Sequence, residues 1–448
     1  MIRDSSVAAT FRDWQIVLKI LIYSLYFAPD LTGNGKYCGE MAEWLAQMGH
    51  EVRAVTAPPY YPQWRRPPEY AALRYYHERW RGTRVWRAPI WVPRNPSGSA
   101  RVLHLLSFAA TSWPLMLRQL LWRPEIVLVV APTIASAPMG WVVARLTGAT
   151  AWLHLQDFEV EVAFKLGLLR RQRLQQLMLT IERHLLRRFD RVSTISGRMF
   201  ERLLSKGVEP ERTFLFPNWV DLSLFDLGKC TQRMRSELSI SPNAIVVLYS
   251  GTLAAKQGLE IVPAVARLLL DRAEIIFVVG GDGLMKPQLQ QASVNLPNLR
   301  LLPLQPADRL GELLGMADIH LLPQSPAAAD LVLPSKLSGM LASGRPVIST
   351  CAPGTELAEV VAGCGLVVPP EDASAMAKAV LRLAEDEPLR HELGRRARLW
   401  AERNIEQSTV LNRAFDHALL GRDRRSKTTT ERETGTGTAA DSPLSGGP

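Results

Sequence analysis

Three loops in the second half of the chain combine glycines, lysines and a helix start in a way that could bind a diphosphate. Each loop follows a short apolar run that is typical of a buried strand. Glycines let backbone N–H groups approach a ligand closely, lysine supplies a point charge, and the first turn of a helix is positive. Together the loops predict a cradle for a nucleotide diphosphate. Its residues are Gly251 and Lys256 in the first loop, Gly281 and Gly283 in the second, and Pro334, Ser335, Lys336 and Leu337 in the third.

A fourth loop, near the start of the chain, carries Gly33 and Gly35 between an apolar run and a helical pattern. Such a loop either binds an anion at the helix start or is simply a turn, and both interpretations stay open. The full dinucleotide-binding pattern of three glycines fails at Cys38, and no acidic residue follows the second apolar run near Thr56. The sequence therefore disfavours an NAD-dependent enzyme.

Polar residues also end the apolar run Ala149–Leu155. Gln156 and Asp157 follow it directly, where ligands of parallel sheets bind. They are candidates for the reacting centre, with the alternative that Asp157 only caps the next segment. His154 lies inside the run, and we expect it to be a core histidine whose hydrogen bonds are satisfied.

The elements that must position these loops alternate along the whole chain. Short apolar runs and longer helical patterns follow one another twice, with a joint near residues 217–241 that is rich in Pro, Asn, Asp and Ser. This alternation predicts an α/β fold of two doubly wound parallel sheets, Rossmann-like domains that face each other across a cleft. The predicted parts are an N-terminal extension over 1–17, domains over 18–217 and 218–402, a closing helix over 403–420 and a disordered tail over 421–448.

Charge is unevenly distributed over the first half. Between Tyr60 and Glu125 there are eleven Arg and six Trp but only three Glu, and no Lys or Asp. Arginine mixed with aromatic residues suits nucleic acid or the anionic surface of a membrane, while the plainer alternative is a solvated basic face. The apolar window Val102–Leu117 is shorter than the roughly 20 residues of a spanning helix, so we expect a buried or interfacial helix.

The remaining composition points to a cytoplasmic location. The four cysteines form no CxxC pair, which argues against a disulfide framework or a zinc site and fits a reducing compartment. The N-terminus is interrupted by Asp4, Arg12 and Asp13 and does not resemble a signal peptide. Acidic DxD pairs do not follow any predicted strand, so we expect no metal and no cofactor.

The chain resembles the retaining GT-B glycosyltransferases of family 4. The matching segments span about Leu18–Asn404 and include LKILIYSLYFAPDLTGNGKY, GTLAAKQGLE, VGGDGLMK, LPSKLSGMLASGRPVIS and GTELAEVV. The resemblance implies that the second domain binds a GDP- or UDP-linked sugar and the first domain binds the acceptor. By this resemblance Lys256 contacts the diphosphate, Gly281 and Gly283 line the donor site, the turn 334–337 meets the diphosphate or ribose, and residues 33–35 approach the transferred sugar.

The segments WVPRNPSG and LHLQDFEVE are similar to members of the family that act in exopolysaccharide assembly of the colanic-acid type. This similarity implies transfer of a sugar, with fucose as the candidate. The implied acceptor is linked to polyprenyl diphosphate, and the implied location is the inner face of the cytoplasmic membrane. The Arg- and Trp-rich stretch would then dock on that membrane surface.

The chain departs from the family pattern at four positions. Thr252 stands where an Arg is common, and Gln156 stands where a His is common. The family's paired glutamates fall at Leu331 and Gly339, and Asp330 is the candidate substitute for the first. Two other functions remain as alternatives: a nucleotide-sugar epimerase, for which few suitable carboxylates are present, and a nucleic-acid binding protein, for which no motif is present.

Overall fold

The computed structural model describes residues 17–30, 33–61, 63–71, 73–94, 98–131, 134–158, 160–161, 172–225, 231–254, 257–325 and 334–419. The predicted disordered tail and nearly all of the predicted N-terminal extension lie outside these residues. The chain forms two compact units, here called the first and second domains. The first consists of Met1–Thr194, Leu203–Phe216 and Leu411–Pro448, and the second of Ile195–Arg202 and Pro217–Val410.

An eight-stranded sheet forms the centre of the first domain, in the order β3-β4-β2-β1-β5-β6-β7-β8. The pairing is parallel except between β3 and β4, which are antiparallel. The strands are β1 (Lys19–Ser24), β2 (Glu51–Thr56), β3 (Tyr76–Trp80), β4 (Thr83–Arg87), β5 (Ile126–Ala131), β6 (Thr150–Leu155), β7 (Arg191–Thr194) and β8 (Thr213–Leu215). The two outermost strands, β3 and β8, were not predicted, because neither is a buried apolar run of ordinary length.

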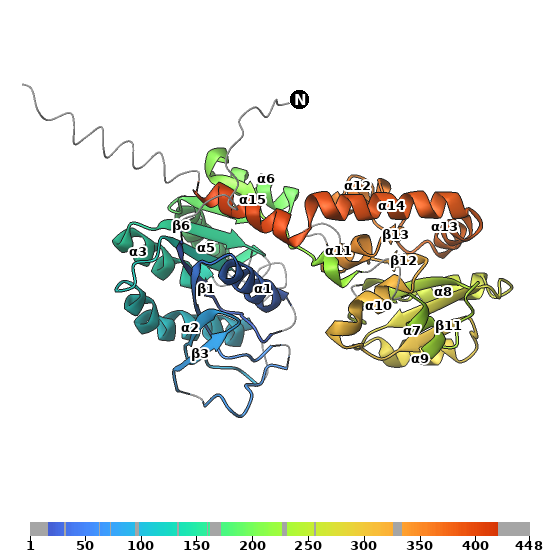
Figure 1. Cartoon of the computed structure of the whole chain (residues 1–448), viewed down its shortest axis with the longest axis horizontal. Coiled ribbons are helices and arrows are strands. Elements are labelled where there is room, and N and C mark those ends of the chain that lie inside the picture. The colour runs from blue at the N-terminus through green and yellow to red at the C-terminus, as the bar shows by residue number, and fades with distance from the viewer. Residues whose placement is uncertain are drawn as a thin grey trace, which may run out of the picture. The chain divides into compact units, whose positions relative to one another are not determined.

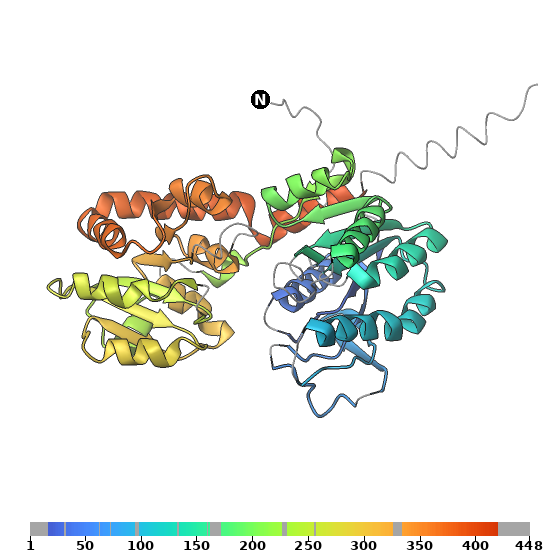
Figure 2. The same cartoon turned by 180° about the vertical axis from the view of Figure 1, so that it is seen from behind.

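Helices cover both faces of this sheet. Helix α1 lies on the face seen in Figure 1, and α2 and α3 lie on the face seen in Figure 2. The helices of this part of the chain are α1 (Gly33–Gln47), α2 (Gly98–Gln119), α3 (Ala137–Thr147), α5 (Gln172–Leu186), α6 (Gly197–Ser205) and α15 (Gln407–Leu419). The last helix returns to the first domain, where the ring of Phe415 contacts those of Trp44 and Trp152.

A six-stranded sheet forms the centre of the second domain, in the order β11-β10-β9-β12-β13-β14. All of its pairs are parallel. The strands are β9 (Ile245–Ser250), β10 (Ile275–Gly280), β11 (Leu299–Leu302), β12 (Ile319–Leu322), β13 (Val347–Thr350) and β14 (Gly365–Val368). These strands agree with the predicted alternation of apolar runs and helical patterns, and the predicted pair of parallel α/β sheets is confirmed.

Alternate residues of β9 enter two separate cores. Val246 and Leu248 pack with α10, α11 and α14, whereas Val247 and Tyr249 pack with α8, α9 and α13. A strand buried on both faces is therefore apolar throughout, as the sequence predicted. The helices are α7 (Thr231–Glu237), α8 (Ile261–Leu268), α9 (Lys286–Ser293), α10 (Leu310–Gly315), α11 (Ser335–Ala342), α12 (Glu356–Ala362), α13 (Ala373–Glu385) and α14 (Glu387–Asn404).

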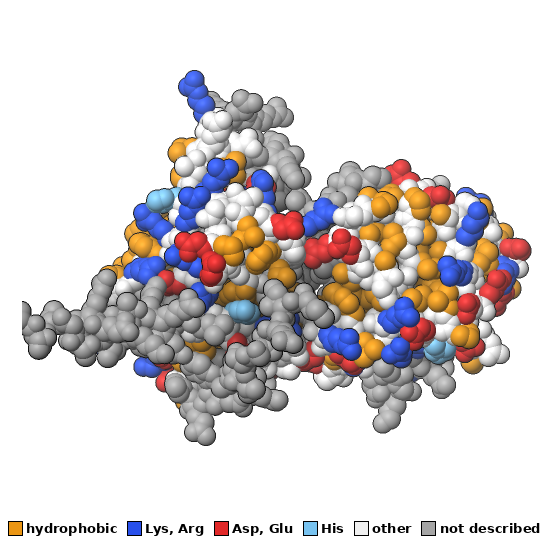
Figure 3. Space-filling view, turned by 90° about the horizontal axis from the view of Figure 1, so that it is seen from above, with side chains coloured by type: hydrophobic (Ala, Val, Ile, Leu, Met, Phe, Trp, Pro, Cys, Tyr) orange, Lys and Arg blue, Asp and Glu red, His pale blue; other side chains and the backbone are white. Residues whose placement is uncertain are grey.

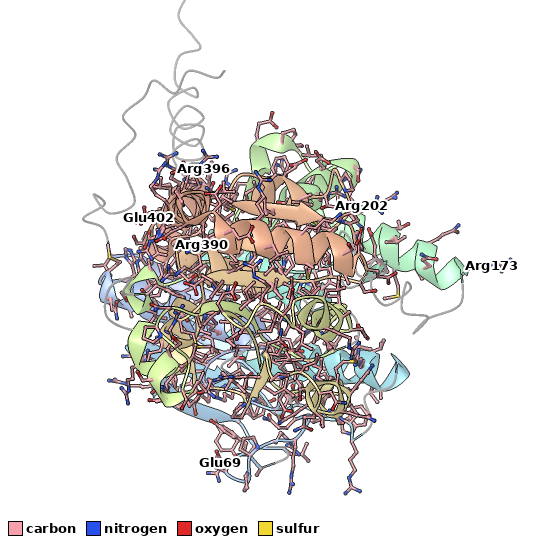
Figure 4. All side chains as sticks on the ribbon, turned by 90° about the vertical axis from the view of Figure 1, so that its right-hand side faces the viewer. Glu69, Arg173, Arg202, Arg390, Arg396 and Glu402 are labelled. Atoms are coloured by element: carbon pink, nitrogen blue, oxygen red, sulfur yellow. The ribbon has the colours of Figure 1, made fainter. Side chains whose placement is uncertain are left out.

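The outer face of α14 shows an ordinary solvated surface. Arg396 and Glu402 lie along this helix (Figure 4), and each is paired with an opposite charge one turn away. Acidic and basic side chains are intermingled over the second domain in Figure 3. Such exposed pairs add little to stability, but they keep the surface soluble.

Burial of His320 on β12 makes the second domain sensitive to acid. Its side chain is fully buried with Nε2 2.9 Å from Ser343 Oγ, and burial, with Arg345 nearby, lowers the pKa of His320 to about 3. The unfolded chain binds a proton near pH 6.5 and the folded chain does not, so stability falls as the pH drops from 6.5 towards 3. We expect a loss of up to about 1.4 kcal/mol for each pH unit in this window.

The variant His320→Gln tests this expectation. Its unfolding midpoint in guanidinium should fall less between pH 7.5 and pH 5.5 than that of the parent chain, whatever its stability at pH 7.5. The matched control is His391→Gln, because His391 is exposed on α14. If His320→Gln and His391→Gln show the same pH slope as the parent chain, His320 does not govern acid sensitivity.

Candidate functional site

The loops after β9 and β10 pack against each other through their backbones. Gly251 N–H donates to Gly280 O at 2.9 Å. A Cβ at Gly281 would lie 1.9 Å from Gly251 O, and one at Gly283 would lie 2.3 Å from Leu253 O. Both positions also have a positive φ that other residues rarely adopt. This packing therefore requires glycine at both positions. As a result, the loops at the carboxyl ends of the adjacent strands β9 and β10 present backbone that carries no side chain at these positions.

Lys336, on the first turn of α11, reaches this pair of loops. Its ammonium donates to Tyr249 Oη, to Gln257 Oε1 at 3.0 Å and to Thr252 O at 3.4 Å. The stem packs on Gly251, where a Cβ would lie 2.3 Å from Lys336 Cε. Burial raises the pKa of Tyr249, so its hydroxyl stays protonated and donates to Thr252 O at 2.8 Å. A positive charge is thus held over the glycine loops by three oxygens.

The start of α11 supplies the third part of the predicted cradle. Pro334 precedes the helix with extended backbone, and the exposed Ser335 is its first residue. The first N–H groups of a helix lack partners within the helix and carry a partial positive charge. Leu337 differs from its neighbours, because its side chain is buried in the core and its N–H donates to Pro334 O.

Two predicted donor-site residues, Lys256 and Asp330, lie outside the described residues. Gly339, where the family's second glutamate falls, lies among the described residues of α11. A Cβ at Gly339 would lie 2.8 Å from Leu314 Cδ1, and Leu314 belongs to the core of the second domain. A side chain at position 339 would therefore require Leu314 to shift within the core.

In the first domain, the predicted glycine loop leads into α1. Gly33 is the first residue of the helix with φ +59°, and Gly35 approaches Asp30 so closely that a Cβ would lie 2.5 Å from Asp30 Cβ. Burial raises the pKa of Asp30 to about 6, although the charge of Arg87 opposes this shift. The buried Arg87 donates to two backbone carbonyls and to Glu78. Neither Asp30 nor Arg87 was singled out from the sequence, since nothing in a local pattern marks a buried charge.

Gln156 follows β6 directly and contacts a buried chain of polar side chains. Gln156 Nε2 lies 2.9 Å from His154 Nε2, and His154 Nδ1 lies 3.0 Å from Ser193 Oγ, which also accepts from Trp152 Nε1. Burial lowers the pKa of His154 to about 3, so the imidazole is neutral. His154 is thus a core histidine with satisfied hydrogen bonds, as predicted. Gln156 is buried beside it, whereas Asp157 is exposed.

The segment after Asp157 is anchored by Lys206. This ammonium lies 4.9 Å from the centre of the Phe158 ring and 2.8 Å from Glu161, and it also pairs with Glu182. Lys206 and Glu182 are almost fully buried. The cluster connects the end of β6 to α5 and α6, and no local sequence pattern indicates it, because its members are far apart along the chain.

The structure therefore assembles the predicted residues in two groups, one within each domain. Gly251, Gly281, Gly283 and Lys336 meet at one end of the second sheet. Gly33, Gly35, Gln156 and Asp157 follow strands β1 and β6 of the first sheet, which are separated by β5. The first group can bind an anion, and the second offers an amide and a carboxylate.

Comparison with known proteins matches both domains. The model of the glycosyl transferase 4-like domain covers residues 32–219, and that of the glycosyl transferases group 1 covers residues 231–400. The chain is 41% identical over 414 residues to WcaI of Escherichia coli K12, a protein named for glycosyl transfer in colanic acid biosynthesis, covering 90% of this chain and 100% of WcaI.

Solved structures share the fold. Sucrose-phosphate synthase of Thermosynechococcus elongatus superposes with a TM-score of 0.65 at 17% identity, over 92% of this chain and 100% of that protein. HepE of Anabaena, in complex with UDP and glucose, gives a TM-score of 0.60 at 15% identity, over the same shares of each chain. With both of its domains matched in order and the WcaI relative covered in full, the chain belongs to the family 4 glycosyltransferases of the GT-B fold.

Proposed function

We propose that this glycosyltransferase moves a sugar, with retention at the anomeric carbon, from a nucleotide diphosphate to a lipid-linked oligosaccharide of exopolysaccharide assembly. The observation that carries the donor half is the ammonium of Lys336 above the glycine loops of the second domain. The name of WcaI supports colanic-acid-like assembly, and we propose fucose as the transferred sugar. The UDP and UDP-glucose complexes of HepE support a nucleotide sugar as donor.

Sugar transfer of this kind needs charge stabilisation on the departing diphosphate. In many enzymes, fixed positive groups aimed at the developing charge contribute more to catalysis than any other effect. Lys336 and the first turn of α11 offer such groups without a divalent ion, and we propose that the reaction is metal-independent. Transfer activity should accordingly persist in the presence of EDTA.

The acceptor half of the proposal places the protein at the inner face of the cytoplasmic membrane. Among the described residues, no helix is long and apolar enough to cross a bilayer. A polyprenyl-diphosphate-linked acceptor would bring its saccharide to the first domain, where Gln156 and Asp157 follow β6. We propose Asp157 as the carboxylate that orients the acceptor hydroxyl or stabilises positive charge on the sugar.

A panel of GDP- and UDP-sugars tests the proposed function. A bound donor at about 100 times its Kd should stabilise the protein by about 2.7 kcal/mol in a thermal-shift experiment. The donor identified in this way should then yield a glycosylated product only when a lipid-linked acceptor is added. Conversion of the donor sugar without acceptor would show an epimerase instead, and stabilisation by DNA alone would show a nucleic-acid binding protein.

The variant Asp157→Asn tests the role of the exposed carboxylate. Because the amide keeps the shape and removes the charge, we expect kcat to fall by about 10²-fold with the donor-induced thermal shift unchanged. The measurement is nucleotide release with and without acceptor. Glu201→Gln, an exposed carboxylate on α6, is the matched control. Full turnover in Asp157→Asn would remove Asp157 from the reaction.

A further inference from the structure

Helix α2 exposes a continuous apolar stripe. Leu103, Leu106, Trp113 and Leu117 are between 45% and 56% exposed. Their spacing of three to seven residues places them on one side of the helix, together with the exposed Ala110. A surface helix of a soluble protein ordinarily presents polar residues to solvent, so this stripe requires an explanation.

Polar residues of α2 lie on its buried side instead. His104, Ser112 and Gln119 are buried, and each has hydrogen-bond partners. His104 Nδ1 lies 2.6 Å from Trp91 O, Ser112 Oγ lies 2.5 Å from Tyr23 Oη, and Gln119 Oε1 accepts from Arg53 at 3.1 Å. Turning the helix to hide its leucines would leave these polar groups without partners. The exposure of the apolar stripe is therefore determined by the packing of α2.

Two aromatic residues beside α2 widen the apolar surface. Trp91 is 45% exposed, and its backbone N–H donates to Ser107 Oγ on the helix. Tyr75 is 43% exposed, and its hydroxyl donates to Thr111 O. Trp and Tyr are the side chains that prefer the boundary between lipid and water, since each combines an apolar ring with a polar atom.

Arginine dominates the charge of the chain segment that contains the stripe. The 46 residues from Arg79 to Pro124 include eight arginines and no acidic residue. Arg101 and Arg118 on α2 and Arg123 just beyond it are exposed. A second copy of the same face would present the same positive charges, so pairing of two copies through it would be repulsive. An anionic surface with an apolar interior is complementary to both the apolar stripe and the arginines.

We propose that α2 is an interfacial helix that docks the first domain on an anionic lipid bilayer. Leu103, Leu106, Trp113 and Leu117 enter the boundary of the acyl chains, and the arginines remain among the lipid phosphates. The proposal rests on the proposed function only in taking the acceptor to be membrane-bound. It assigns the contact to one helix face, which the Arg- and Trp-rich composition alone could not do.

Co-sedimentation with vesicles tests this docking. The parent chain should sediment with vesicles containing phosphatidylglycerol at low salt and less at high salt, and it should stay in the supernatant when the vesicles are pure phosphatidylcholine. The double variant Leu106→Ser/Trp113→Ser should bind at least about tenfold more weakly, because it loses the largest inserted groups. The matched control is Leu268→Ser/Leu270→Ser, which changes two exposed leucines of the second domain and should bind as the parent does.

A measurement of donor binding distinguishes a failure of the docking helix from a failure of the proposed function. The double variant should keep the same thermal shift with the nucleotide sugar, which also shows that it is folded. A chain that binds vesicles but no nucleotide sugar would overturn the proposed function and leave the docking helix intact. Unchanged vesicle binding by the double variant, equal binding to neutral vesicles, or a loss of self-association in its place would overturn the docking helix.

Discussion

Lys336→Met should lower kcat for sugar transfer by about 10²- to 10³-fold, the loss observed when one preorganised donor to a developing charge is removed. Methionine keeps the length and apolar stem that packs on Gly251 but removes the ammonium held by Tyr249, Gln257 and Thr252. The loss should appear in kcat, because the diphosphate gains negative charge as the bond to the sugar breaks. Steady-state release of the nucleotide at varied donor concentration measures it.

Two further variants test whether the loss of rate comes from the charge of Lys336 and its geometry. Lys336→Arg keeps the charge with a different geometry, and it should recover part of the rate without reaching that of the parent chain. Lys378→Met, an exposed lysine on α13, should be indistinguishable from the parent. A variant Lys336→Met with unchanged kcat and a raised KM would show that the ammonium binds the donor equally in the ground and transition states, against our proposal.

Lys206→Met should destabilise the first domain by about 3–5 kcal/mol, as expected when one partner of a buried ion pair is removed. The change leaves Glu182 almost fully buried and Glu161 largely buried, without the ammonium that both contact. Because Phe158 also packs against this ammonium, the segment that follows Asp157 should lose its anchor. Guanidinium unfolding, followed separately for the two domains, measures the free energy.

The double variant Lys206→Met/Glu182→Gln distinguishes a lost ion pair from a lost packing contact. Removing the uncompensated carboxylate should recover a large part of the stability if charge burial causes the loss. Lys286→Met breaks an exposed pair with Asp282 and should change the free energy of unfolding by less than about 1 kcal/mol. Equal effects of Lys206→Met and Lys286→Met would contradict a buried cluster.

The sequence predicted the second sheet fully and the first sheet in part, for one physical reason. Strands buried on both faces are largely apolar, and this pattern is clearest in β9 and β10. The outer strand β3 is YHERW, with exposed and half-buried residues alternating, and β8 has three residues. Short helices such as α7 and α12, with seven residues each, also lack enough turns to show a period.

The candidate site was predictable where chemistry depends on local sequence. Glycines, a lysine and a helix start stand close together along the chain, so the donor loops could be recognised. The partners of these groups could not, because Tyr249 meets Lys336 and Ser193 meets His154 only after the strands have paired. Hydropathy also indicated the apolar character of α2 but not its orientation, which depends on buried His104, Ser112 and Gln119.

The return of α15 has a consequence for building chimeras. The first domain is made of separate pieces of chain, and Phe415, from the last of them, packs on Trp44 and Trp152. A fragment that stops at residue 217 would leave those two indole rings without this partner. A hybrid that borrows its nucleotide-sugar domain from a relative should therefore receive residues 195–202 and 217–410 from that relative, with the segment 411–419 kept from the same parent as the rest of the first domain.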